Sequence, residues 1–377
     1  MAQSRRIAVL KERARGEKRV CATPETVKKF CALGATVAVE QGAGLQASIL
    51  DEEYSAAGAE IAAADEVVRE ADIVLGIQGP DPALLSGAKD GAWIVASLDP
   101  LGQRERVEAY AAAGLEALAM EFMPRITRAQ SMDVLSSQSN LSGYKAVLAA
   151  ANEYGRAFPM MMTAAGTITA AKFFVMGVGV AGLQAIATAR RLGAQVSATD
   201  VRSATKEQIM SLGAKPVFVE DVAGIEGEGS GGYASEMSEE YQKAQAELVS
   251  RHIAKQDIVI TTALIPGRPA PRLITDAQIA TMKPGSVIFD LAVPQGGNVE
   301  GSVADEVAEK HGVKIIGYSN TPAHLPADCS ALFARNLYNF LSAFWDEEQG
   351  GPVLDEEIGN AVRLTRGGKV VNERLLG

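Results

Sequence analysis

The chain has 377 residues, of which 47% are hydrophobic and 22% charged, and its formal net charge is -10. This composition is that of a soluble globular protein, and the length suffices for two ordinary domains. The acidic balance argues against nucleic acid and against anionic lipid as direct partners.

The cysteines and histidines are few and scattered. Without a C-x-x-C pair, the cysteines predict a reducing cytosol and not a disulfide framework. The histidines show no metal-ligand spacing, so no metal site is predicted. The polar Met1–Arg6 predicts no signal peptide. The residues concerned are Cys21, Cys31, Cys329, His252, His311 and His324.

Strand-like and helix-like segments alternate from the start of the chain. Thr23 and Pro24 predict the start of a helix that runs to Leu33, with Gly34 just past its end. This βαβ rhythm implies a mostly parallel sheet with helices on both faces. The strands are expected at Ile7–Leu10, Thr36–Glu40, Ile73–Ile77, Trp93–Leu98 and Glu116–Ala119, and further helices near Ala64–Ala71 and Gln103–Ala113.

A long helix, roughly Met132–Arg156, is expected to connect to a second domain. The strong helix near Ala327–Trp345 has no local partner and is expected to return to the first domain. We therefore predict an α/β fold of two doubly wound, Rossmann-like domains separated by a cleft, comprising residues 1–135 plus 327–377 and residues 136–326. Its later elements are expected at Phe173–Met176, Ala181–Leu192, Val196–Thr199, Glu239–Lys255, Ile258–Thr261, Val287–Asp290 and Lys314–Ile316.

A glycine fingerprint follows the apolar run Phe173–Met176. In its G-x-G-x-x-G pattern the first glycine makes a tight turn, the second lets the backbone approach a pyrophosphate, and the third lets the next helix pack close to the strand. The helix N-terminus then faces the phosphates. The fingerprint runs Gly177, Val178, Gly179, Val180, Ala181 and Gly182.

An acidic residue, Asp200, ends the next apolar run. A carboxylate about 20 residues after the fingerprint accepts hydrogen bonds from the adenosine ribose and repels a 2′-phosphate, which favours NAD(H) over NADP(H). Arg202 weakens this preference, because an arginine there can hold such a phosphate. The alternative is a glycine turn that only packs a helix on a sheet.

Two segments have more than one interpretation. Phe158–Ala189 carries one charge, Lys172, but its glycines indicate a buried strand, turn and helix instead of a membrane span. Gly224–Gly232 holds five glycines and is followed by Tyr233. It is either a flexible surface loop or a lid over a bound nucleotide.

The densest polar cluster lies at 123–140, after a predicted strand and at the mouth of the predicted cleft. Arg125, Gln130 and Asp133 offer a donor, an amide and an acceptor, which suits a nicotinamide carboxamide and its ribose. No nucleophile–base pair is present in the pattern, as expected where the cofactors carry the chemistry. The alternative is a capping loop with Asp133 or Ser131 at the helix N-cap.

Several strings resemble the NAD(H)-binding domain I of proton-translocating nicotinamide nucleotide transhydrogenase, within the alanine dehydrogenase/transhydrogenase family. The resemblance covers nearly the whole chain. It implies a cytoplasmic homodimer, attached to the inner membrane only through partner subunits. The strings are Pro124–Asp133, Phe158–Thr167, Thr261–Gly267, Gly177–Gly182 and Asp200–Arg202.

The resemblance also implies an activity and its partners. Each copy binds NADH, a separate domain III presents NADP⁺, and a membrane domain II conducts protons. Hydride passes directly from NADH to NADP⁺ and is coupled to proton translocation. The chain itself is expected not to insert into the membrane.

Site residues follow from the resemblance by position. The nicotinamide end is implied to lie at Arg125, Gln130, Ser131, Met132, Asp133 and Ser136. The rest of the cofactor is implied to contact Gly177, Gly179, Val180, Ala181, Gly182, Asp200, Val201, Arg202, Gly232, Tyr233, Gln245 and Leu264. The resemblance implies that Tyr233 belongs to a mobile loop, which favours the interpretation of Gly224–Gly232 as a lid.

Two other functions compete with this one. The first is alanine dehydrogenase, where Arg19 matches the substrate-binding arginine, but Ser97 and Gln78 stand where that enzyme has its catalytic histidine and its substrate lysine. Their loss removes the groups that amino-acid oxidation needs. The second is a non-catalytic NAD(H)-sensing module, for which a preorganised nicotinamide loop would serve no purpose.

Overall fold

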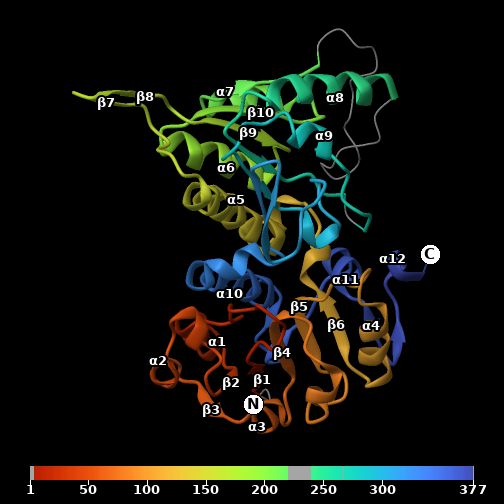
Figure 1. Cartoon of the computed structure of the whole chain (residues 1–377). Helices are drawn as coiled ribbons and strands as arrows, with labels where there is room; N and C mark the ends of the chain where they lie inside the picture. Colours follow the sequence, from red (N-terminus) through yellow and green to blue (C-terminus); the bar gives the residue numbers. More distant parts are fainter. Residues whose placement is uncertain (1–3, 220–238, 266, 377) are drawn as a thin grey trace. The chain divides into compact units, whose positions relative to one another are not determined.

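The computed structural model describes residues 4–219, 239–265 and 267–376. The chain forms two compact units, unit 1 with Met1–Gln138 and Ala323–Gly377, and unit 2 with Ser139–Pro322. Within each unit a mostly parallel sheet is flanked by helices on both faces (Figure 1). The predicted α/β class is confirmed.

Unit 1 contains a six-stranded sheet in the order β3-β2-β1-β4-β5-β6, with every neighbouring pair parallel. The chain runs from the middle to one edge and then crosses to the other, so the strand order reverses between β1 and β4. The strands are β1 (Arg6–Val9), β2 (Thr36–Glu40), β3 (Glu60–Ala62), β4 (Ile73–Gln78), β5 (Trp93–Ser97) and β6 (Glu116–Ala119).

Both faces of this sheet are buried. Ile7 and Val9 of β1 pack with α1 and α10, whereas Ala8 packs with α3 and α4. Alternate side chains point to opposite faces of a strand, so strands that are apolar throughout require helices on both sides. The helices are α1 (Pro24–Ala32), α2 (Asp51–Ala56), α3 (Ala64–Val68), α4 (Arg104–Ala112), α10 (Pro326–Ala343), α11 (Glu356–Val362) and α12 (Glu373–Leu376).

The C-terminal segment covers the β6 edge of this sheet. The backbone N–H of Leu364 donates to the carbonyl of Ala117 at 2.7 Å. The hydroxyl of Thr365 accepts from the N–H of Ala117 at 2.8 Å. This segment pairs as a short hairpin, β18 (Thr365–Arg366) with β19 (Lys369–Val370), and a second hairpin pairs β16 (Trp345–Asp346) with β17 (Gly351–Pro352). Sheet edges covered in this way are protected from pairing with other chains.

Unit 2 contains a seven-stranded sheet in the order β11-β10-β9-β12-β13-β15-β14, in which β14 is antiparallel. Here the order reverses between β9 and β12. The strands are β9 (Lys172–Met176), β10 (Gln195–Thr199), β11 (Lys215–Pro216), β12 (Ile258–Thr261), β13 (Val287–Asp290), β14 (Glu306–Lys310) and β15 (Val313–Gly317).

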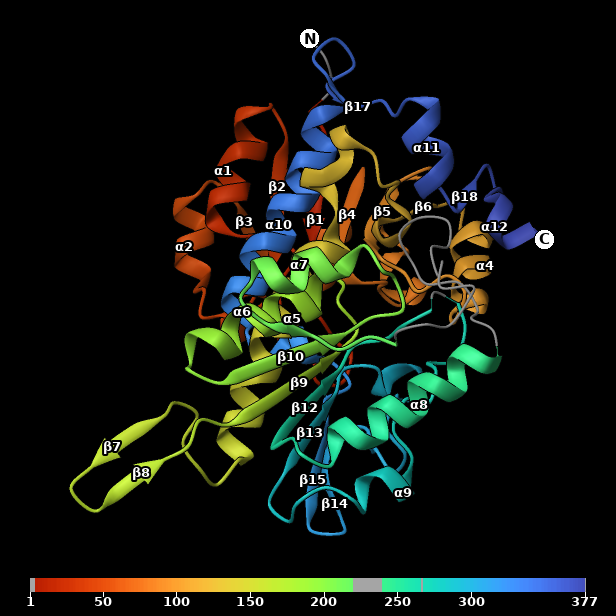
Figure 2. The ribbon, with the colours of Figure 1, turned by 90° about the horizontal axis from the view of Figure 1, so that it is seen from above.

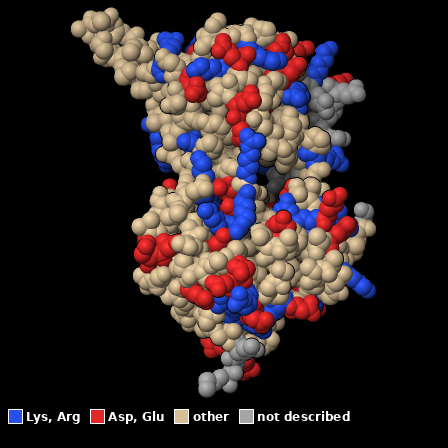
Figure 3. Space-filling model, turned by 60° about the horizontal axis from the view of Figure 1, so that its bottom comes forward, with Lys and Arg blue, Asp and Glu red and all other residues tan. Residues whose placement is uncertain are grey.

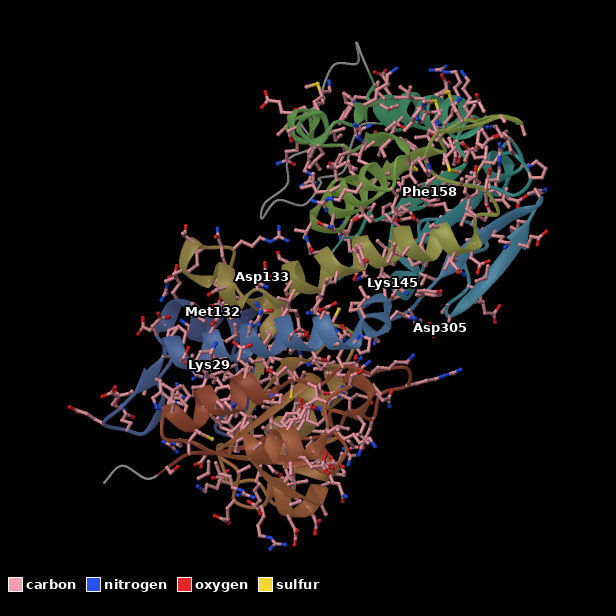
Figure 4. The ribbon with its side chains drawn as sticks, turned by 90° about the vertical axis from the view of Figure 1, so that its left-hand side faces the viewer. Lys29, Met132, Asp133, Lys145, Phe158 and Asp305 are labelled. Atoms are coloured by element: carbon pink, nitrogen blue, oxygen red, sulfur yellow. The ribbon has the colours of Figure 1, made fainter. Side chains whose placement is uncertain are left out.

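Helices cover both faces of this sheet as well. Phe173 and Val175 of β9 pack in one core cluster with residues of α5 and α6, and Phe174 packs in the other with residues of α8 and α9. The helices are α5 (Val134–Glu153, which begins in unit 1), α6 (Val180–Arg191), α7 (Thr205–Ser211), α8 (Glu239–Ile253) and α9 (Asp276–Ile279). Phe158, just after α5, makes an edge-on ring contact with Phe173 (Figure 4).

One interpretation of the apolar segment Phe158–Ala189 is only partly correct. Lys172–Met176 and the helix after it are the predicted strand and helix, but the residues before them form an exposed hairpin of β7 (Met161–Thr163) and β8 (Gly166–Ile168). Figure 2 shows this hairpin extending away from the sheet of unit 2. Apolarity alone did not distinguish a core strand from an arm with unburied apolar side chains.

Charged side chains of both signs are interspersed over the face shown in Figure 3. Within the described ranges, no helix combines the length and the apolar character needed to cross a bilayer.

Candidate nucleotide-binding site

The glycine turn of unit 2 has the geometry that the fingerprint predicts. Gly177 follows β9 with φ at +100°, a conformation that side chains other than hydrogen rarely allow. A Cβ on Gly177 would lie 2.5 Å from the Oγ1 of Thr262. The Thr262 hydroxyl in turn donates to the carbonyl of Gly177 at 3.0 Å. The turn is therefore fixed to the end of the neighbouring strand, β12.

The third glycine is required by close packing. A Cβ on Gly182 would lie 1.9 Å from the carbonyl oxygen of Gly177, so α6 can approach β9 only with glycine there. Gly143 of α5 likewise permits close packing, here between α5 and α6. A Cβ added to Gly143 would lie 2.1 Å from the carbonyl oxygen of Ala181. Sequence patterns did not reveal Gly143, because a lone glycine inside a helix carries no local signal of its packing partner.

The second glycine borders open space. No described atom beyond its chain neighbours lies within 4 Å of a Cβ built on Gly179, and its φ of -80° is open to any residue. Gly179 is also the N-cap of α6, and no described side chain caps this helix. Unsatisfied N–H groups and the helix dipole make such an end an anion site. Val180 and Ala181 lie in its first turn.

Asp200 follows β10 and is buried, with 8% of its surface exposed. Its Oδ2 accepts from the N–H of Val178 at 2.7 Å, so it also stabilises the glycine turn. Its Oδ1 accepts from the backbone N–H and from the Nε of Arg202, both at 2.9 Å. The Nη2 of Arg202 donates to Oδ2 at 3.0 Å, which completes a two-pronged ion pair.

This pairing sets the charge state of Asp200. Burial raises the pKa of Asp200, but the hydrogen bonds from the Arg202 side chain and from the backbone outweigh it, so the pKa lies below the usual range. The carboxylate stays ionised at neutral pH and can accept hydrogen bonds from ribose hydroxyls. Arg202, engaged by Asp200, is directed toward that carboxylate.

Three of the remaining predicted site residues of unit 2 are described by the structure, and two are not. Val201 is partly buried beside Asp200, and Leu264 follows β12 with 39% of its surface exposed. Gln245 is half-buried in α8. Gly232 and Tyr233, and with them the lid interpretation, lie outside the described residues.

Unit 1 carries the polar loop. It forms a 3-10 turn, η4 (Thr127–Met132), followed at once by α5. Arg125 and Gln130 are exposed, whereas Met132 is buried in the core of unit 1. Figure 4 shows Asp133 where α5 begins and Met132 beside it. The buried methionine anchors the loop while the polar residues stay accessible.

Asp133 also caps α5. Its Oδ1 accepts from the N–H of Ser136 at 2.9 Å and its Oδ2 from the hydroxyl of Ser136 at 2.5 Å. Such a contact satisfies one of the free N–H groups at the helix start. The capping interpretation is thus correct for Asp133, and it fixes Asp133 and Ser136 relative to one another. The backbone of Ser131 is held from α10, by Asn336.

The arginine that matches the alanine dehydrogenase substrate residue is already occupied. Arg19 donates through Nε and Nη2 to the two carboxylate oxygens of Glu17, at 2.7 and 2.6 Å. Its Nη1 donates to the Oε1 of Gln138 at 2.8 Å. Gln78 also donates to Glu17, at 3.0 Å. The fork of donors that would bind a substrate carboxylate therefore already binds a side chain.

A cavity of about 680 Å³ opens at the carboxyl ends of β1 and β4 in unit 1. Glu12 lines it and accepts from the N–H of Ile77 at 2.6 Å. Burial, and to a lesser degree the nearby Glu17, raises the pKa of Glu12 to about 7. No three metal-ligating side chains gather anywhere in the described ranges.

Glu12→Gln should stabilise the protein more at pH 8 than at pH 5. A carboxyl whose folded pKa lies above its unfolded value contributes stability that is lost as pH rises from about 4.5 to about 7. The neutral glutamine avoids this loss, so unfolding by urea should show a gain of roughly 2–3 kcal/mol at pH 8 over the wild type. Glu108→Gln, on the exposed side of α4, is the control. Equal gains at the two pH values would contradict the argument.

The two units share the Rossmann strand order over their first five strands, and unit 2 adds a tight glycine turn, an open helix end and a buried acidic residue. These features define a Rossmann-type nucleotide-binding protein. The chain matches the N-terminal domain of "Alanine dehydrogenase/PNT" over residues 8–142 and its C-terminal domain over residues 146–373. The chain belongs to this alanine dehydrogenase/PNT family.

Individual relatives place the chain within the family. It is 53% identical over 380 residues to the first part of NAD(P) transhydrogenase subunit alpha from Rhodospirillum rubrum, with 99% of each chain covered. A solved structure of transhydrogenase from Sinorhizobium meliloti is 54% identical and superposes with a TM-score of 0.88, covering 97% of this chain and 100% of that one. Alanine dehydrogenase 1 of Staphylococcus aureus is 26% identical over 98% of this chain and 95% of its own. The chain is thus more similar to these transhydrogenase proteins than to this alanine dehydrogenase.

Proposed function

We propose that this chain is the NAD(H)-binding subunit of a proton-translocating NAD(P) transhydrogenase. In this function, hydride passes directly from NADH to NADP⁺ held by a partner domain III, coupled to proton translocation through a membrane domain II. The names of the relatives at 53% and 54% identity support the choice. Bound NADH supplies the hydride, and the protein supplies position and electrostatics.

Unit 2 holds the adenosine and pyrophosphate half in this proposal. Gly179, Val180 and Ala181 place the free N–H groups of α6 against the pyrophosphate, and Gly182 permits that approach. Asp200, with Val201 and Arg202 beside it, receives the adenosine ribose. Leu264 and Gln245 flank the adenine, and Gly232 and Tyr233, which the family resemblance adds to this half of the site, lie outside the described residues.

Unit 1 holds the nicotinamide end. Gln130 offers both a donor and an acceptor to the carboxamide, and Arg125 offers further donors. Asp133 and Ser136, locked by two hydrogen bonds, face the nicotinamide ribose. These side chains orient the ring so that one face is turned to the second nicotinamide, which must come within roughly 3–3.5 Å.

The Arg19–Glu17 ion pair supports this proposal over alanine dehydrogenase. Both carboxylate oxygens of Glu17 are bound by Arg19 at 2.6–2.7 Å, so this arginine has no fork left for an amino acid. Ser97 and Gln78 further remove the acid–base and carbonyl-polarising groups. A purely sensory role would leave the ordered loop at Gln130 without a purpose.

The assembly belongs to the same proposal. We place the chain as a homodimer in the cytoplasm, on the inner membrane through domains II and III. The β7–β8 hairpin supports self-association, because Met160 and Met162 are 63% and 79% exposed and an apolar arm of this kind is typical of a contact surface. NADP(H) is assigned to the partner, since within the described residues Gly177–Gly182 is the only G-x-G-x-x-G run that follows a strand and opens an α-helix.

The proposal is tested by mixing the purified subunit with a purified NADP(H)-binding domain III. The wild type should reduce an acetylpyridine NADP⁺ analogue with NADH only when domain III is present. Gln130→Ala should lower the single-turnover rate by about 100-fold while changing NADH affinity less than threefold, since a misplacement of about 1 Å can cost that much in rate.

Two further outcomes bear on the proposal. A parallel fall of rate and NADH affinity in Gln130→Ala would show that the loop only anchors the cofactor. Turnover of alanine with NAD⁺ by the isolated chain would instead establish the dehydrogenase.

A further inference from the structure

A continuous line of hydrogen-bonded side chains runs through unit 1 and ends on the backbone of the polar loop. This line of side chains links the end of β4, the segment between β1 and α1, and the first turn of α5 to the middle of α10. From α10 it reaches η4. We call it the buried polar network, and its members are Gln78, Glu17, Arg19, Gln138, Ser137 and Asn336.

The network is anchored by an ion pair in the interior. The Glu17 side chain is fully buried and the Arg19 side chain is 8% exposed. The carboxylate also accepts from the backbone N–H of Arg19 at 3.0 Å and from Gln78. A buried ion pair with its hydrogen bonds satisfied is rigid, because breaking it leaves an unpaired charge in the protein interior.

The second link passes from this ion pair to α5 and α10. The Oε1 of Gln138 accepts from Arg19, and its Nε2 donates to the carbonyl of Cys329 at 3.1 Å. The same amide donates to the hydroxyl of Ser137 at 3.2 Å. The first turn of α5, which starts one residue after Asp133, is thereby held to α10.

The last link fixes the loop itself. The Ser137 hydroxyl donates to the Oδ1 of Asn336 at 2.7 Å, and the Nδ2 of Asn336 donates to the carbonyl of Ser131 at 2.8 Å. The carbonyl of Ser131 can only accept, so the Nδ2 of Asn336 must face it. The Oδ1 of Asn336 then faces Ser137, and the Ser137 hydroxyl must be the donor. Asn339 gives the same carbonyl a second, longer bond of 3.1 Å.

The loop needs this support from outside. At the end of η4 the N–H of Asp133 reaches the carbonyl of Gln130 only at 3.4 Å, which is a long and therefore weak hydrogen bond for closing a 3-10 turn. In the sequence, Ser131 lies between Gln130 and Asp133, two of the residues assigned to the nicotinamide end. A shift of this peptide would move Gln130 and Asp133 together.

We propose that Asn336 is a positioning residue for hydride transfer, acting through the Ser131 carbonyl on the nicotinamide-facing loop, with the Glu17–Arg19 pair as its fixed base. The proposal rests on the function proposed above. It also gives Arg19 a role in this chain: the arginine that matches a substrate-binding residue holds α5, through Gln138.

The test compares Asn336→Leu with Asn339→Leu in the subunit mixed with domain III. Asn336→Leu should lower the single-turnover hydride-transfer rate roughly 10- to 100-fold and change the NADH Kd of the subunit less than twofold. Asn339→Leu, which leaves the Asn336 bond in place, should lower the rate less than threefold. Amide hydrogen exchange at residues 129–133 should accelerate only in Asn336→Leu.

The outcomes separate this proposal from the function it rests on. A wild type that transfers no hydride with domain III would overturn both. A wild-type rate in folded Asn336→Leu, or a rate that falls in proportion to NADH affinity and thermal stability, would overturn the positioning role alone. Unchanged exchange at residues 129–133 would do the same, whatever the rate.

Discussion

Gly179→Ala should weaken NADH binding about 10- to 100-fold, or roughly 1.4–2.8 kcal/mol, without lowering the stability of the protein. The added methyl group meets no described atom within 4 Å, and its φ of -80° suits alanine. The only cost arises when the pyrophosphate must occupy the space that the methyl group fills. Fluorescence titration with NADH and thermal unfolding of the same sample measure the two effects.

Gly182→Ala is the matched control for this experiment. Its methyl carbon would lie 1.9 Å from the carbonyl of Gly177, so α6 must move away from β9 and both stability and affinity should fall. If Gly179→Ala instead bound NADH like the wild type, the pyrophosphate would not approach α6 at this point, and the assignment of the fingerprint would fail.

Asp200→Ser should reduce the preference for NADH over NADPH by roughly 100-fold or more. In the wild type the buried carboxylate repels a 2′-phosphate and holds Arg202 in a two-pronged ion pair. The serine removes that charge and releases the guanidinium, which is well suited to bind a phosphate. NADH affinity should fall and NADPH affinity should rise, as measured by titration of both nucleotides.

The double variant Asp200→Ser with Arg202→Ala separates the two contributions. It should lose the gain in NADPH affinity while keeping the loss in NADH affinity. A wild type that binds the two nucleotides equally would remove the role assigned to Asp200 and point to Arg202 as a phosphate ligand.

The glycine turn of the candidate nucleotide site and the place of Asp200 beside it could be predicted from local sequence. A strand, a glycine turn, a helix and an acidic residue after the next strand fall within Phe173–Asp200, and short-range geometry largely decides their arrangement. The same local signals gave the parallel α/β class, because continuous apolar runs between helical segments must be covered on both faces.

Other parts of the fold were beyond local reasoning. The hairpin of β7 and β8 has the same apolar composition as a core strand, and only the tertiary structure shows that nothing described covers it. Gly143 resembles any glycine in a helix until α6 is packed against it. In each case the presence or absence of a contact with a residue distant in sequence decides the structure, and no spacing pattern records it.

The sequence by itself determined the fold class, the glycine turn and the place of Asp200, since these depend on residues close together in the chain. The tertiary structure decided what surrounds them. It binds Arg19 to Glu17, pairs Asp200 with Arg202, and brings Asn336 to the carbonyl of Ser131 across 205 residues. The physical reason is that hydrogen-bond partners are selected by distance in space, which only the packing of helices and sheet establishes.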